Sequence, residues 1–146
     1  MPRYARLFQY PEEVVEAWRE SLRKGDLEGA LSLWFEEDSV SCVLPDGVRL
    51  VGHSELREGF KGMLSSRPLI LDNLSAIAHS SMGVSFIDST EAVRLGEHFL
   101  EPALFINMTT VLIQGSKGWQ IAHLHASQVP KDLIQSPSFA GDHGFH

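Results

Sequence analysis

The sequence has very little cysteine: Cys42 is the single one among 146 residues, so no disulfide can form within the chain. A lone cysteine in an apolar run, SVSCVL, is expected to be a small buried residue rather than a nucleophile. A chain without disulfides suits a reducing compartment. The first residues, MPRYARLFQYPEE, lack the apolar core of a signal peptide. We therefore expect a cytoplasmic location.

Basic residues are also scarce. The sequence has twelve Lys and Arg residues and nineteen Asp and Glu residues, which gives a formal net charge of -7. The basic residues form no run. Because nucleic-acid binding requires a clustered basic surface, no nucleic-acid partner is expected. No apolar run approaches the ~20 residues needed to span a bilayer, so no membrane association is expected either. A chain of this length and ordinary composition is expected to form one globular domain.

The first half of the sequence is typical of helices interrupted by a short hairpin. Helical spacing of apolar residues predicts one helix over about 11–24 and a second over 27–35. The segments 39–44 and 48–51 flank a Pro-Asp-Gly turn and predict a hairpin. A third helix is predicted after Gly52, where the apolar residues again recur every three or four positions.

The second half is typical of long strands joined by turns. The turn between the first two strands can lie at 80–83 or at 88–90, and the composition slightly favours 88–90. Helices followed by hairpin-linked strands predict an α+β fold with an antiparallel sheet, one face of which packs on the helices. The predicted strands cover residues 69–79, 92–100, 103–113 and 118–127. The predicted divisions are an extension over 1–10, a domain over 11–129 and a tail over 130–146.

Two histidines lie on the last predicted strand, GWQIAHLHAS. Strict alternation places His123 and His125 on one face, together with Trp119 and Ile121. Such a pair can bind a metal, exchange protons or pack in a sheet surface. A zinc site needs at least a third ligand, and the sequence does not determine one, so we expect no metal and no cofactor. The candidates for a third ligand are His98, Asp142, His143 and His146.

The order of these elements resembles the nuclear transport factor 2-like superfamily, most closely its SnoaL-like and calmodulin-dependent kinase association-domain branches. The likeness rests on RKGDLEGALSLW, VRLVGHSELREGF and above all TTVLIQGSKGWQIAHLHAS, and it covers residues 11–128. It implies a cone in which three N-terminal helices pack on a strongly curved antiparallel sheet. It further implies a pocket inside the cone and a homodimer formed through the outer face of the sheet.

The resemblance also implies which residues face each way. Groups that line the pocket of such proteins correspond to alternate positions on the last strand, which would turn the two histidines outward. The expected pocket residues are Trp18, Trp34, Phe60, Met63, Met108, Thr110, Ala122, Leu124 and Ala126. The expected dimer-interface residues are Phe105, Asn107, Thr109, Val111, Trp119, Ile121, His123 and His125.

The catalytic groups of related families have no counterpart here. Ketosteroid isomerases carry a tyrosine and two carboxyl groups at positions that resemble Trp18, Leu44 and Thr110. The kinase association domain carries arginines at positions that resemble Thr110 and Ala126. The catalytic residues are therefore unknown, and the favoured function is binding of a small apolar ligand. Two alternatives stay open. One is an isomerase, cyclase or lyase acting on a small polycyclic or polyketide-like substrate, and the other is a structural oligomerisation module that resembles the kinase hub.

Overall fold

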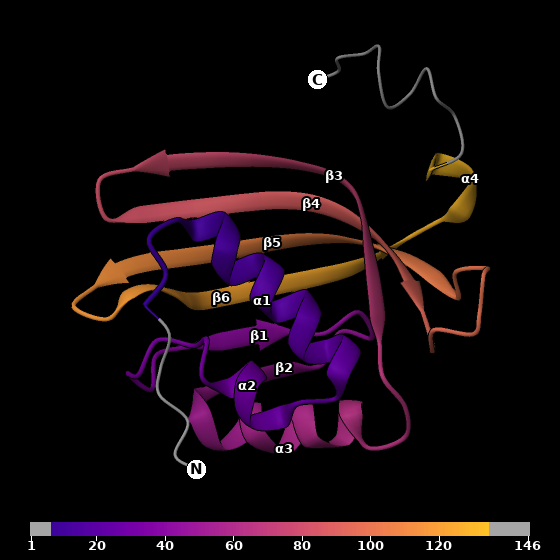
Figure 1. The fold of residues 1–146 in the computed structure, drawn as a ribbon, viewed down its shortest axis with the longest axis horizontal. Coiled ribbons are helices and arrows are strands. Elements are labelled where there is room, and N and C mark those ends of the chain that lie inside the picture. Colours follow the sequence, from indigo (N-terminus) through magenta and orange to yellow (C-terminus); the bar gives the residue numbers. More distant parts are fainter. Residues whose placement is uncertain (1–6, 135–146) are drawn as a thin grey trace.

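The computed structural model describes residues 7–134 and shows helices on one side of a six-stranded sheet (Figure 1). None of the helices in this range is long and apolar enough to cross a membrane. The helices are α1 (Pro11–Lys24), α2 (Leu27–Leu31), α3 (Gly52–Leu64) and the short α4 (Lys131–Ile134). The strands are β1 (Ser41–Val43), β2 (Arg49–Val51), β3 (Ile70–Ser81), β4 (Val84–Arg94), β5 (Leu104–Gly115) and β6 (Gly118–Val129).

The first helix begins and ends where the sequence predicts. Pro11 occupies its first turn, where a backbone N–H is not needed. The Glu13 carboxylate accepts a hydrogen bond from the Tyr10 N–H at 3.2 Å and so caps the helix. Gly25 ends the helix with a φ of 66°, a conformation that glycine adopts without strain. The buried face of α1 then packs against the sheet.

The second helix is shorter than predicted and ends at Leu31 rather than near Phe35. The following residues join the sheet instead: the Ile121 N–H donates to the Leu33 carbonyl, and the Phe35 N–H donates to the Ile121 carbonyl, both at 2.8 Å. Trp34 therefore forms a bridge with β6. Hydrogen bonding to an available sheet edge outweighs the helical spacing of the apolar residues.

The sheet has the strand order β2-β1-β6-β5-β4-β3. The prediction of a wholly antiparallel sheet is wrong at one place. There β1 pairs in parallel with β6, and Ser41 lies opposite His123. These two strands are far apart in the sequence, so no tight hairpin forces them to run in opposite directions. The other neighbours are antiparallel.

The hairpin between β3 and β4 turns at residues 82–83, so the favoured prediction of a turn at 88–90 is wrong. Gly83 has a φ of 79° and allows the tight turn. Asp88 lies in the middle of β4, where its carboxylate accepts a hydrogen bond from the Thr109 hydroxyl at 2.8 Å. Polar residues there stand on the outer face of a strand and do not mark a break in it.

A β-bulge at Ala122 changes which side chains of β6 face the core. Leu112 pairs with Ile121, whereas Val111 pairs with His123, so Ala122 is an additional residue without a partner of its own. The alternation therefore shifts by one position within β6. Trp119 and Ile121 are buried in the core, and the prediction that they share the outer face with the histidines is wrong.

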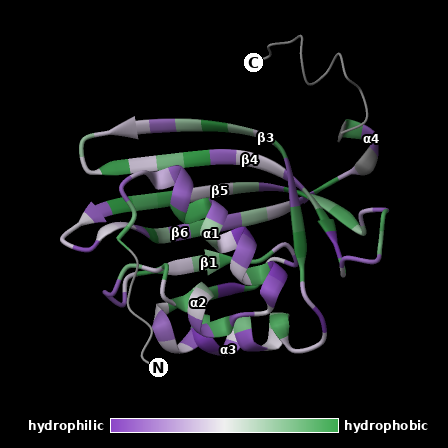
Figure 2. Cartoon of the chain, in the orientation of Figure 1, coloured by the Kyte–Doolittle hydropathy of each residue, from purple (hydrophilic) through white to green (hydrophobic). Residues whose placement is uncertain are grey.

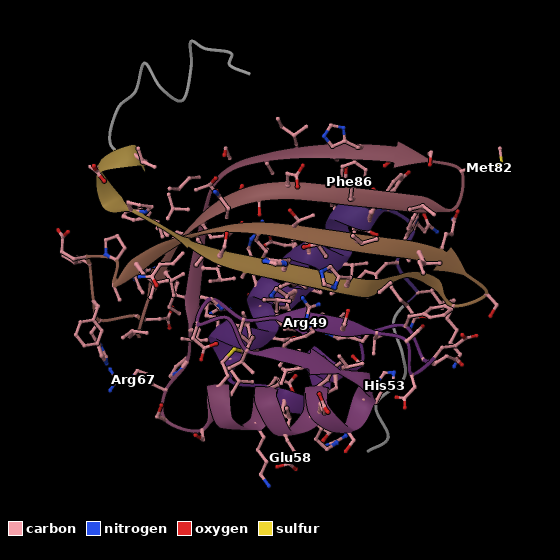
Figure 3. The ribbon with its side chains drawn as sticks, turned by 180° about the vertical axis from the view of Figure 1, so that it is seen from behind. Arg49, His53, Glu58, Arg67, Met82 and Phe86 are labelled. Carbon is pink, nitrogen blue, oxygen red and sulfur yellow. The ribbon has the colours of Figure 1, made fainter. Side chains whose placement is uncertain are left out.

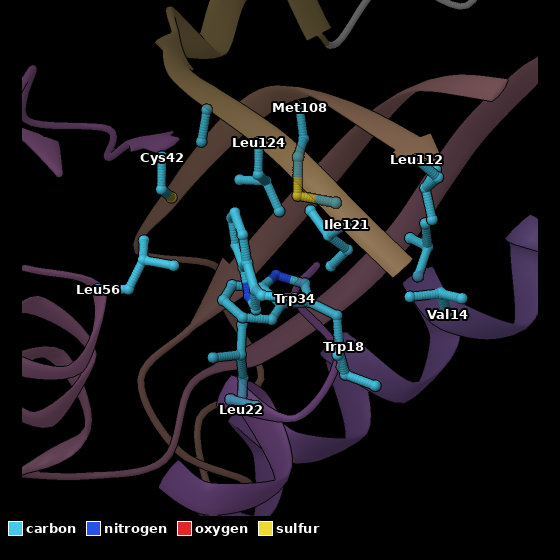
Figure 4. Packing of buried hydrophobic residues seen from close by; sticks show 14 of the residues in the cluster. Val14, Trp18, Leu22, Trp34, Cys42, Leu56, Met108, Leu112, Ile121 and Leu124 are labelled. Carbon is cyan, nitrogen blue, oxygen red and sulfur yellow. The ribbon is translucent and has the colours of Figure 1, made fainter. Parts of the chain in front are cut away.

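One face of the sheet is covered and the other is open. Figure 1 shows α1 lying across the covered face, with α3 next to the β2 edge. Seen from behind, no helix covers the strands (Figure 3). Both helices carry hydrophobic and hydrophilic residues (Figure 2), and the apolar faces of both contribute to one core. The indoles of Trp18 and Trp34 lie in this core, close to Leu124 and Met108 (Figure 4).

Candidate functional site

A cavity of about 500 Å³ opens between the helices and the covered face of the sheet. It is bounded by α1, the β1–β2 turn, α3 and one end of the strands β3 to β6. Its lining residues are Trp18, Leu22, Leu44, Pro45, Asp46, Glu58, Gly59, Gly62, Met63, Leu69, Leu71, Val93, Leu95, Leu104, Ile106, Met108, Leu124 and Ala126. Apart from Asp46 and Glu58, all of these are apolar residues or glycines.

The inner wall of the cavity is built on rigid elements. Met108, Leu124 and Ala126 come from the centre of β5 and β6 and are all nearly inaccessible to solvent. Trp18 on α1 is held by edge-on contacts with Phe60 and Trp34, with ring centroids 5.2 and 6.0 Å apart. Aromatic contacts of this kind contribute to stability beyond the burial of area. The wall that a ligand would meet is therefore well ordered.

Charged groups occur where the cavity meets solvent. Asp46 lies in the β1–β2 turn and is exposed, and its Oδ1 accepts a hydrogen bond from the Val48 N–H at 3.0 Å. Glu58 lies on α3 and is also exposed. Among residues 7–134, no histidine, cysteine, tyrosine, lysine or arginine lines the cavity. The cavity thus has an apolar interior and an acidic opening.

The structure brings together some of the predicted pocket residues and separates the others. Trp18, Met63, Met108, Leu124 and Ala126 line the cavity. The remaining four do not. Trp34, Phe60 and Thr110 are buried behind the wall, and Ala122 is the half-buried bulge residue.

Several lining residues were not predicted. Leu71, Val93 and Leu95 lie where β3 and β4 approach the α3 side of the domain. Their apolar character was visible in the sequence. Their place at a cavity depends on the strand register, which the misplaced turn at 88–90 had obscured.

Buried polar atoms without partners lie next to the inner wall. Among the described residues, nothing hydrogen-bonds to Trp34 Nε1, Ser89 Oγ or Thr110 Oγ1. Thr110 pairs with the lining residue Leu124 across the strands and lies two positions from Met108. Leaving a buried polar group unpaired costs roughly 1–3 kcal/mol of stability.

The histidine pair lies on the open face of the sheet, away from the cavity. His123 Nδ1 is 2.8 Å from the Ser41 hydroxyl, and the His123 and His125 ring centroids are 6.1 Å apart. Partial burial lowers the pKa of His123, and the neighbouring His125 and Arg49 act in the same direction, against the hydrogen bond with Ser41. Neutral His123 is therefore favoured in the folded protein.

Within residues 7–134, no three His, Cys, Asp or Glu side chains lie close enough to hold a metal ion. His98 lies in the loop after β4, and the other possible third ligands, Asp142, His143 and His146, are outside the described residues. Cys42 is buried as predicted, and burial raises the pKa of its thiol to about 12. A thiol of that kind is not a nucleophile at neutral pH.

An ion pair that the sequence did not predict lies between α1 and β4. Arg19 donates through Nε and Nη2 to the two carboxylate oxygens of Glu91, at 3.0 and 2.9 Å. The Asn73 amide donates to Oε2 of the same carboxylate at 2.9 Å. Glu91 is fully buried. Burial by itself lowers the pKa of Arg19, but the hydrogen bond to Glu91 and the negative charge of Glu91 outweigh the effect of burial, so the pKa of Arg19 is raised. Glu91 was not recognisable as an inward-facing strand residue, because the turn predicted at 88–90 left it outside the predicted strands.

Comparison with known proteins places the chain in a family. The family model of the SnoaL-like domain matches residues 12–132. No curated protein matches the sequence.

Among solved structures, a candidate calcium/calmodulin-dependent protein kinase type II association domain from Thiobacillus denitrificans is similar, with a TM-score of 0.74 and 21% identity over 85% of this chain and 98% of that chain. A candidate dehydratase of the nuclear transport factor 2-like family from Streptomyces avermitilis is similar with a TM-score of 0.74 and 22% identity. The match covers 82% of this chain and 93% of that chain. A Nostoc punctiforme protein of unknown function with a cystatin-like fold has a TM-score of 0.70 and 20% identity, over 82% and 89%. Identities this low show the shared fold alone. The family model, which covers most of the sequence, shows that the chain belongs to the SnoaL-like domain family.

Proposed function

We propose that this domain binds a small, mostly apolar molecule in the cavity between α1, α3 and the sheet. The observation that carries the proposal is the cavity itself, about 500 Å³ with an almost wholly apolar lining. Pockets for small molecules typically have volumes of roughly 300–1,000 Å³ and bury most of the ligand surface. The proposal includes the cone-like arrangement that the resemblance implies, with helices and sheet surrounding the ligand.

Binding is favoured over catalysis because the lining offers so little acid–base chemistry. General acid–base catalysis requires positioned titratable groups within hydrogen-bond reach of the substrate. Here the titratable side chains of the lining are Asp46 and Glu58, both at the exposed opening. The wall beside Met108 and Leu124 carries no such group. A purely structural module with a filled interior is disfavoured by the volume of the cavity.

Replacement of Ala126 by phenylalanine tests the proposal. The Ala126 side chain lines the cavity, so the larger ring should enter empty space, leave the thermal unfolding temperature nearly unchanged and abolish uptake of a probe such as 1-decanol. If the interior were filled, the same change would overpack the core and cost roughly 1–3 kcal/mol. Ala78→Phe, at an exposed position of β3, is the matched control and should bind the probe normally. Binding can be followed through the intrinsic fluorescence of the three tryptophans, one of which, Trp18, lines the cavity.

We also propose that the open sheet face pairs with a second copy of the chain. Ile77 and Phe86 on this face are 63% and 42% exposed, and Phe105, Val111 and His123 are half-buried there. An apolar face of this kind is typical of a self-complementary interface around a two-fold axis.

The dimer can be tested at the centre of the face. His125→Glu should place a carboxylate inside the proposed interface and shift the chain to monomers in sedimentation velocity. Ser54→Glu, which adds the same charge on exposed α3, should leave the association unchanged. The proposed interface would be contradicted if the unchanged protein and both variants all sedimented as monomers. It would also be contradicted if all three sedimented as dimers.

A further inference from the structure

We infer that the cavity selects ligands whose polar end is a cation, namely an amphiphilic amine or quaternary ammonium, over carboxylate-bearing ligands of the same length. This inference rests on the proposed binding function and adds a ligand class to it. It is based on the distribution of charge around the cavity.

The lining itself contains charge of one sign. Within the part of the chain that the structure describes, its charged residues are Asp46 and Glu58, and both are exposed at the opening. The interior wall at Trp18, Met108 and Leu124 is apolar and deeply buried. A ligand with one apolar and one polar end would therefore place the apolar end against this wall. Its polar end would then lie beside two carboxylates.

The carboxylate of Asp46 is held in place by its own turn. Its Oδ1 accepts a hydrogen bond from the Val48 N–H at 3.0 Å, an arrangement typical of Asp in turns. No donor to its second oxygen, Oδ2, occurs among the described residues. A fixed acceptor loses little conformational entropy when it binds an ammonium group, so it contributes more to affinity than a mobile one.

Two arginines that directly precede lining residues are already paired with acids. Arg94, which precedes the lining residue Leu95, binds Asp72 through Nε at 2.7 Å and Nη2 at 3.2 Å. Arg57, which precedes Glu58, binds Glu28 at 2.7 Å. Neither guanidinium is therefore available to a ligand carboxylate without the loss of an ion pair.

Lys61 and Arg67 are the cations that could reverse this preference. Lys61 is an exposed residue of α3 that does not line the cavity. Arg67 borders a neighbouring depression of about 420 Å³ that shares Leu95 with the cavity. The same depression contains Glu97 and His98, so its charge is mixed, and Arg67 does not line the apolar cavity. The net charge of -7 additionally favours the approach of cations over anions.

Three probes with the same ten-carbon chain test the inference: decylamine, 1-decanol and decanoate. Titration of the full chain at neutral pH, followed by calorimetry and by tryptophan fluorescence, should give an affinity for decylamine about tenfold or more above that for decanoate, with 1-decanol between them. The preference should shrink when salt is raised from about 20 mM to about 500 mM, because the opening is solvated.

Asp46→Asn combined with Glu58→Gln should reduce the ratio between amine and carboxylate to about twofold or less, with the affinity for 1-decanol unchanged. Asparagine retains the turn chemistry at position 46. Glu12→Gln combined with Glu37→Gln removes the same charge from exposed positions away from the cavity and should preserve the preference.

Other outcomes overturn the inference in distinguishable ways. If 1-decanol binds but the amine and the carboxylate bind equally, the inferred ligand class is wrong and the binding function stands. The same holds if the variant with both Asp46→Asn and Glu58→Gln keeps the preference for the amine. If decanoate binds best and Arg67→Gln removes that advantage, the opening selects anions. If none of the three probes binds, the proposed function itself fails.

Discussion

Arg19 on α1 and Glu91 on β4 form an ion pair with two hydrogen bonds, between the helix and the covered face of the sheet. The two N···O distances are 3.0 and 2.9 Å. The carboxylate is inaccessible to solvent and the Arg19 side chain is 13% exposed. Asn73 donates a further hydrogen bond to the carboxylate. The pair thus fixes α1 relative to β4, next to the helix turn that carries Trp18 into the cavity wall.

Removal of one partner should be far more damaging than removal of both. Arg19→Met leaves a buried carboxylate without its cation and should lower the free energy of unfolding by roughly 3–5 kcal/mol. Arg19→Met combined with Glu91→Leu should recover much of that loss, since two apolar side chains can fill the same space. Urea unfolding of the unchanged protein, the two single variants Arg19→Met and Glu91→Leu, and the double variant gives the coupling free energy between the two side chains. Additive losses would show that the pair contributes nothing specific.

Two glycines with the same backbone angle offer a test of how the N-terminal segment packs. Gly118 and Gly83 both have a φ of 79°. A Cβ at Gly118 would lie 2.7 Å from the Phe8 carbonyl oxygen, whereas one at Gly83 would meet nothing within 4 Å. Gly83→Ala should therefore cost about 1 kcal/mol from backbone strain alone.

Gly118→Ala should cost at least about twice as much, because the bridge between Phe8 and β6 must also break. Thermal and urea unfolding of the two variants measure the difference. Equal destabilisation would mean that Phe8 does not dock on β6. In that case residues 7–10 would lie outside the folded domain, and the cost at both positions would come from the turn alone.

The folded state should lose stability as His123 becomes protonated. Its pKa is lowered on folding, chiefly by burial, so protons bind more readily to the unfolded chain. The contribution of neutral His123 is fully present above its unfolded pKa of about 6.5 and is lost as the pH falls through its lower folded value.

His123→Asn should make the urea midpoint less sensitive to pH between about 7.5 and 5. Asparagine can still hydrogen-bond to Ser41 and does not titrate in this range. His98→Asn, in an exposed loop, is the control and should follow the unchanged protein. If His123→Asn kept the full pH dependence, protonation of another group would have to cause it.

The element order and the fold class could be predicted from local patterns, since proline, glycine and apolar spacing act over a few residues. The start of α1 at Pro11 and its end at Gly25 are examples. The face of Trp119 could not be predicted in this way. A bulge at Ala122 requires only a change of backbone pairing, and alanine carries no sequence signal for it.

The candidate site was only half predictable for a different reason. Alternation on β6 and the resemblance correctly indicated that Leu124 and Ala126 face inward. Whether an inward residue lines a cavity or a filled core depends on how the strands of the sheet and the helices pack together. Phe60 and Met63 lie on the same helix, yet Met63 lines the cavity and Phe60 is buried behind it.

The most direct test of ligand binding uses the methionine methyl groups. Met63 and Met108 line the cavity, whereas Met82 is 98% exposed at the β3–β4 turn and serves as an internal control. In a chain labelled with ¹³C at the methionine methyls, addition of 1-decanol should shift the Met63 and Met108 signals and leave Met82 unchanged. Unmoved Met63 and Met108 signals, or equal shifts at all three methyls, would contradict binding inside the cavity.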